Sequence, residues 1–158
     1  MTDPVATVGY QGANPEDLIA TLKAAGIMTL VDVRSVPWSR RPDFTKRALA
    51  ATLAAAGIAY EHLPGLGNPD SGRAAAKDGR MDEVERIYHE QLDSADGQAA
   101  LGHAVEKAGK GPVALLCMER DAARCHRAMA AERLAEMLGT RVRHLRVEAG
   151  PETLPLFR

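Results

Sequence analysis

Short apolar runs alternate along this chain with stretches in which apolar residues recur at helical spacing. The runs fall at 5–10, 27–33, 58–63, 112–117 and 141–147. The run at 27–33 is β-branched and nearly all apolar, as in a strand covered on both faces, whereas 141–147 is more polar and is expected at or near an edge of the sheet. The stretches with helical spacing fall at 15–25, 45–56, 81–92, 98–108 and 121–138. The alternation predicts a three-layer α/β fold, Rossmann-like, with a mainly parallel five-stranded sheet and helices on both faces.

Capping residues mark several of the predicted boundaries. Asn14 followed by Pro15 is typical of a helix start, and Thr45 can cap the second helix. Segment 64–79 is rich in Gly, Pro, Asn and Ser, so we expect it to be irregular and to form a mobile lid.

The chain has 158 residues, of which 46% are hydrophobic, and this length fits one domain. We expect that domain to span 1–148, followed by a C-terminal tail over 149–158. The net charge of -1 gives no global attraction to nucleic acid, so any anion binding must come from a local patch. No signal segment and no run long enough to span a bilayer is visible, so a cytoplasmic protein is expected.

Two cysteines are too few for a disulfide scaffold, and their short spacing suggests chemistry instead. Cys125 is expected in the first turns of a helix between Arg124 and Arg127, where cations and the helix dipole lower a thiol pKa. It is therefore the candidate nucleophile, unless it packs on the apolar face of its helix. Cys117 ends an apolar strand and is either its chemical partner or a small buried hydrophobic residue.

Two specific chemistries fit this spacing poorly. A metal site is not expected, because Cys125 and His126 are adjacent on a helix and point a quarter-turn or more apart. A cysteine-phosphatase loop matches weakly, because the step from Cys117 to Arg124 is one residue too long and lacks glycine. A thiol redox pair stays open, although the spacing is not that of C-x-x-C.

A second group of polar residues follows the strand at 27–33. Carboxyl ends of parallel strands share one edge of a sheet, so we expect this group and the cysteine segment to line one pocket. Asp32 or Glu119 would act as a general base or orient an arginine, and Arg34, Arg40 and Arg127 would hold an anion. The alternative is an internal Asp–Arg ion pair that fixes the loop. The remaining candidate ligand-binding residues are Gly9, Tyr10, Ser39 and His126.

Several of these segments together resemble a known family. They are 9–12, 32–40 with Phe44, 62–67, and 115–119 with 125–127. The chain is similar over 5–145 to domain-of-unknown-function family 488, which is mostly prokaryotic. Its members commonly have a second glycine where this chain has Asn68. The family has no established reaction, so the resemblance implies the grouping of these residues and leaves the function open.

The best interpretation is an enzyme or enzyme-derived domain that binds an anionic, nucleotide or nucleic-acid-related ligand; no cofactor is implied. One alternative is a DNA-maintenance accessory protein whose tail docks to the sliding clamp through Leu154, Leu156 and Phe157. Folding back of that tail onto its own domain is the simpler reading of these residues. A thiol redox sensor is the other alternative.

Overall fold

The computed structural model describes residues 3–36, 39–122 and 126–148, and these contain a five-stranded sheet. The spatial order is β3-β2-β4-β1-β5, and every pairing is parallel. The strands are β1 (Val5–Gly9), β2 (Thr29–Asp32), β3 (Ala59–His62), β4 (Val113–Cys117) and β5 (Val142–His144).

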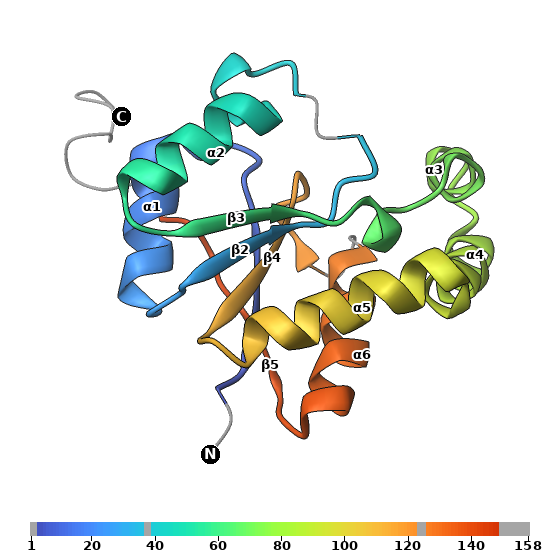
Figure 1. The fold of residues 1–158 in the computed structure, drawn as a ribbon. Coiled ribbons are helices and arrows are strands. Elements are labelled where there is room, and N and C mark those ends of the chain that lie inside the picture. The colour runs from blue at the N-terminus through green and yellow to red at the C-terminus, as the bar shows by residue number, and fades with distance from the viewer. Residues whose placement is uncertain (1–2, 37–38, 123–125, 149–158) are drawn as a thin grey trace.

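Helices cover both faces of the sheet (Figure 1), which confirms the expected three-layer α/β fold. One face carries α1 (Pro15–Ala24) and α2 (Lys46–Ala55). The other carries α4 (Met81–Asp93), α5 (Ala95–Ala108) and α6 (His126–Leu138). Among the described residues, no helix is both long and apolar enough to cross a bilayer.

Alternation along the central strands divides the apolar residues between two cores. Leu30 and Leu116 pack with α1 and α2, whereas Val31, Leu115 and Cys117 pack with α4, α5 and α6. Both faces of β2 and β4 are therefore buried, which explains why these strands read as continuous apolar runs.

The capping predictions had mixed outcomes. Asn14 caps α1 as expected, and its Oδ1 accepts from the backbone N of Asp17 at 2.8 Å. Thr45 occupies the cap position of α2, but its hydroxyl donates to the carbonyl of Pro42 at 3.0 Å. The side-chain cap that Thr45 was expected to make is therefore absent from this part of the structure.

Segment 64–79 is not irregular, and that prediction was wrong. It contains a short 3₁₀ turn, Pro64–Leu66, and the helix α3 (Asp70–Lys77). The alanines of α3 favour a helix, although Gly72 within it obscures the pattern. A Cβ at Gly72 would lie 1.9 Å from Oδ1 of Asn68, so a larger residue there would displace the Asn68 side chain.

The connections place a topological switch point between β2 and β4, which are neighbours in the sheet. From β2 the chain runs through α2, on one face, to β3 at one edge. From β4 it runs through α6, on the other face, to β5 at the opposite edge. Crevices at the carboxyl ends of such strands are the usual ligand sites of open α/β sheets.

Candidate functional site

A cavity of about 620 Å³ lies at the carboxyl ends of β1, β2 and β4, at this switch point. Its volume is within the range of small-molecule sites. Its walls combine charged, amide, sulfur and apolar side chains. The lining residues are Tyr10, Arg34, Ser35, Val36, Asn68, Arg73, Ala76, Lys77, Met81, Val84, Cys117, Met118, Glu119 and His126.

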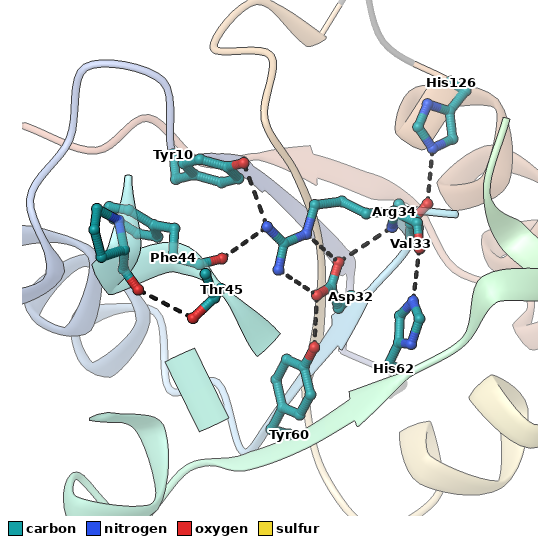
Figure 2. A network of polar contacts seen from close by, with 10 residues as sticks. Tyr10, Asp32, Val33, Arg34, Phe44, Thr45, Tyr60, His62 and His126 are labelled. Atoms are coloured by element: carbon teal, nitrogen blue, oxygen red, sulfur yellow. Dashed lines mark hydrogen bonds and ion pairs between the residues drawn. The ribbon is translucent and has the colours of Figure 1, made fainter. Parts of the chain in front are cut away.

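Arg34, which lines this cavity, forms a buried ion pair with Asp32 (Figure 2). Nε and Nη2 of Arg34 donate to Oδ1 and Oδ2 of Asp32 at 2.9 and 2.7 Å. The backbone N of Arg34 donates to the same Oδ1 at 3.1 Å, so the carboxylate also fixes the exit of β2. Burial alone would lower the pKa of Arg34, but the hydrogen bond and charge of Asp32 outweigh it and raise that pKa.

Other protein groups complete the coordination of this pair. Nη1 of Arg34 donates to the carbonyl of Phe44 at 2.8 Å and to the hydroxyl of Tyr10 at 3.3 Å. The Tyr10 ring stacks on that of Phe44 with centroids 4.5 Å apart. The Tyr60 hydroxyl donates to Oδ2 of Asp32 at 2.6 Å, and burial raises the pKa of Tyr60. Most donors of Arg34 are thus occupied by the protein itself.

Two histidines fix the backbone that leaves β2. Nε2 of His62 contacts the carbonyl of Arg34 at 2.7 Å, and Nε2 of His126 contacts that of Val33 at 2.9 Å. Burial lowers the pKa of His126, which is therefore neutral at pH 7 and donates from Nε2. Its ring also meets that of Tyr88 edge to face, with centroids 5.1 Å apart.

The segment after β4 is held against the end of β1. The backbone N of Gln11 donates to the carbonyl of Met118 at 2.9 Å, and the Gln11 side chain accepts from the backbone N of Arg120 at 3.2 Å. A Cβ at Gly9 would lie 1.8 Å from the carbonyl oxygen of Glu119. Gly9 is therefore needed so that this segment can cross the end of β1 closely.

Arg127 lies fully buried beneath the same segment. It donates to the carbonyls of Glu119 and Arg120, and its Nη1 lies 3.1 Å from Sγ of Cys117. Burial lowers its pKa. Arg127 is thus placed to support the loop that carries Glu119.

Cys117 is not a free thiol, because it is disulfide-bonded. Its side chain is 3% exposed. The chain's other cysteine, Cys125, lies outside the described residues, so its expected nucleophilic role stays a prediction.

Helix α3 brings two cations to the cavity that the sequence did not single out. Arg73 donates to the hydroxyl of Ser35 and, at 3.0 Å, to the carbonyl of Asn68, and it also pairs with Asp70. Lys77 is exposed and forms no ion pair with another described residue. Sequence reasoning missed Arg73 and Lys77 because it expected an irregular segment, whereas the helix α3 places both residues in the cavity wall.

The predicted site residues divide into three groups. The cavity wall contains Tyr10, Arg34, Cys117, Glu119 and His126. The described residues that lie outside its wall are Gly9, Asp32, Ser39, Arg40 and Arg127. Beyond the described residues lie Cys125, Leu154, Leu156 and Phe157.

The members of the second group have other surroundings. Asp32 is screened by Arg34, and Ser39 Oγ accepts from the backbone N of Arg41 at 3.1 Å. Arg40 is exposed. Of the two roles open to Asp32, the geometry favours orienting Arg34 over acting as a base. Within the described ranges, no three His, Cys, Asp or Glu side chains cluster as metal ligands would.

A larger cavity, of about 940 Å³, lies beside β5 and α6. Its arginines, which include Arg120 and Arg146, are offset by Glu119, Asp121 and Glu132. The two cavities share Glu119, but no residue of the segment after β2 or of α3 lines the larger one. Because its charges balance and it has no wall from β2, we regard the cavity at β1, β2 and β4 as the functional site.

Of three comparisons with known proteins, one found a match, which is to a protein family. No curated protein and no solved structure matches the chain. The model of one family, described as Domain of unknown function DUF488, matches residues 14–134. The match spans β2, β3, β4 and most of α6, and thus nearly all of the cavity wall. This chain belongs to the DUF488 family.

Proposed function

We propose that the switch-point cavity is the ligand site of an enzyme or enzyme-derived domain that binds an anionic ligand of the nucleotide class. The observation that carries the proposal is a cavity of about 620 Å³ whose wall contains Arg73 and Lys77 in addition to Arg34, and the charge of Arg34 is neutralised by Asp32. Cationic side chains at the carboxyl edge of a parallel sheet suit a phosphate group.

The charge balance favours α3 as the source of the phosphate contacts. The charge of Arg34 is compensated by Asp32, and Arg127 contacts backbone carbonyls and Cys117 Sγ. Arg73 shares its charge with Asp70, which is largely exposed, and Lys77 has no ion pair within the described part of the chain. Lys77 and Arg73 would therefore bind the anion, while Arg34 and Arg127 position the surrounding backbone.

Glu119 is the acidic side chain in the wall of this cavity. It would act as the general base, since a base must lie within reach of a bound ligand. Asp32 would orient Arg34, and Cys125, whose neighbours in the sequence are basic, would act as a nucleophile only as a free thiolate.

Calorimetry with inorganic phosphate and with 5′-mononucleotides tests the proposal. We expect binding that weakens as salt is raised, because Lys77 is exposed. Lys77→Gln should weaken it about tenfold, as expected for one charge-assisted contact. Lys23→Gln, which removes an exposed charge from α1, should change nothing. Failure of every phosphate-bearing ligand to bind at millimolar concentration would end the nucleotide interpretation.

A thiol redox sensor is the second candidate, and the disulfide at Cys117 favours it. After reduction, Arg127 at 3.1 Å from Sγ would stabilise a thiolate at Cys117. Thiol counting after equilibration in glutathione buffers of graded potential tests this idea. A disulfide that stays closed at every cytosolic potential would exclude a sensing role.

A further inference from the structure

The cavity wall has an apolar part that the phosphate proposal leaves unexplained. Among the described residues, five large apolar side chains are exposed, and three of them line this one cavity. These are Val36, Met81 and Met118, at 60%, 52% and 48% exposure. Isolated exposed apolar residues are ordinary, but a cluster in a cavity points to a ligand.

The three side chains come from separate parts of the fold. Val36 follows β2, Met118 follows β4, and Met81 is the first residue of α4. Ala76 of α3 and Val84 of α4 extend the same wall. Their convergence therefore results from the tertiary fold and from no single amphipathic helix.

The chemistry of this apolar wall suits a flat ring. Thioether side chains adapt to irregular shapes and make favourable contacts with aromatic rings. Lys77 of α3 and Met81 of α4 lie four residues apart in the chain, and both line the cavity. A phosphate and a ring joined by a sugar could therefore contact both elements together.

We propose that Val36, Met81 and Met118 form a nucleobase subsite, so that the ligand is a phosphorylated nucleoside held by its base at this wall and by its phosphate at Arg73 and Lys77. This inference rests on the proposed function and specifies its substrate class. A side-chain amide that could contact a base edge is also present, since Asn68 lines the same cavity.

The test compares ligands with and without the base. Calorimetry would use the four ribonucleoside 5′-monophosphates and ribose 5-phosphate, with the full chain. We expect at least one nucleotide to bind about tenfold more tightly than ribose 5-phosphate, because only the nucleotide has an aromatic base to bury against the apolar wall. Met81→Gln and Met118→Gln should remove most of that preference and leave the binding of ribose 5-phosphate unchanged.

Two matched controls exist in the same chain. Met28 and Met137 are 53% and 50% exposed and do not line the cavity, so Met28→Gln and Met137→Gln should preserve the preference. Val36→Thr, which keeps the side-chain shape, gives a third variant if a methionine substitution disturbs folding. A preference that the cavity variants leave intact would overturn the subsite.

The failures of the two proposals are distinguishable. Equal binding of nucleotides and ribose 5-phosphate would overturn the nucleobase subsite and leave the phosphate site in place. If neither class binds but apolar peptides do, the wall is a protein-docking surface, and both proposals are wrong.

Discussion

At the scale of single residues, the Asp32–Arg34 pair determines what this site can do. A carboxylate with no exposed surface and a guanidinium at 7% exposure hold each other and the exit of β2. Because Asp32 and Arg34 are bonded to each other and to other protein groups, substituting either residue should change the stability of the protein more than its affinity for a ligand.

Arg34→Met should lower the free energy of unfolding by about 3–5 kcal/mol, since it leaves the Asp32 carboxylate buried without its cation. Tyr60→Phe removes one hydrogen bond to that carboxylate and should cost less, about 1.5–3 kcal/mol. Urea unfolding measures both. The double variant Asp32→Leu/Arg34→Met should be more stable than Arg34→Met alone; the opposite order would show that the pair is not a coupled unit.

His126 should make stability depend on pH. Its folded pKa lies below its ordinary value of 6.5 because the ring is buried, so the unfolded chain binds the proton more readily. Stability is therefore complete above about pH 6.5 and falls as the pH is lowered through the depressed folded pKa.

His126→Gln keeps an N–H donor for the carbonyl of Val33 but cannot be protonated. Its stability should fall less steeply than that of the natural chain between about pH 7 and pH 5, measured by urea unfolding. The pKa of His144 is also lowered by burial, but this residue is present in both proteins and cancels in the comparison. Parallel curves would contradict the account of His126.

Some of the side-chain contacts at this site could be predicted from the sequence, and others could not. Period-two alternation places Asp32 and Arg34 on one side of the strand end, and the structure joins them there. Tyr60 could not be found in this way, since its contact with Asp32 depends on the pairing of β3 with β2. Arg73 was missed because its contact with Ser35 spans 38 residues and requires α3.

At the scale of elements, the site depends on how closely the segment after β4 crosses the end of β1. Gly9 allows that crossing and thereby places Glu119 in the cavity wall. Backbone bonds of Tyr10 and Gln11 to Cys117 and Met118 hold the same crossing. A substitution at Gly9 should therefore displace Glu119 in the cavity wall.

Gly9→Ala should destabilise the protein by about 2 kcal/mol, since its Cβ would require the backbone of Glu119 to move. Gly102→Ala is the matched control: this glycine is exposed within α5 and has no atom within 4 Å of an added Cβ. It should stabilise the protein by up to about 1 kcal/mol. Thermal unfolding of both variants checks the pair, and equal effects would contradict the close crossing.

Helices and strands that are well buried were easier to predict from the sequence than exposed ones. The strands β1, β2 and β4 were visible because both of their faces are covered, and α1 was visible because Asn14 caps it. Helix α3 was not visible, because it is short, largely exposed and interrupted by Gly72. The glycine packs against the Asn68 side chain, a contact that the sequence does not reveal. Sequence periodicity carries little information about such a peripheral helix.

At the scale of the whole molecule, strand order explains why chemistry-bearing side chains from 10 to 126 share one cavity. The exits of β1, β2 and β4 lie at one edge, and the chain leaves β2 and β4 towards opposite faces of the sheet. The open crevice between these connections is a consequence of topology, so it would survive most changes to individual side chains.

The central claim is that the ligand binds in this cavity, and a titration of the ¹⁵N-labelled protein with a 5′-mononucleotide tests it most directly. If the ligand binds there, amide shifts will concentrate at residues of the cavity wall, such as Ser35, Val36, Arg73 and Met118. Shifts confined to Gln11, Arg120 and Arg146 around the larger cavity, or no shifts at millimolar ligand, would contradict it.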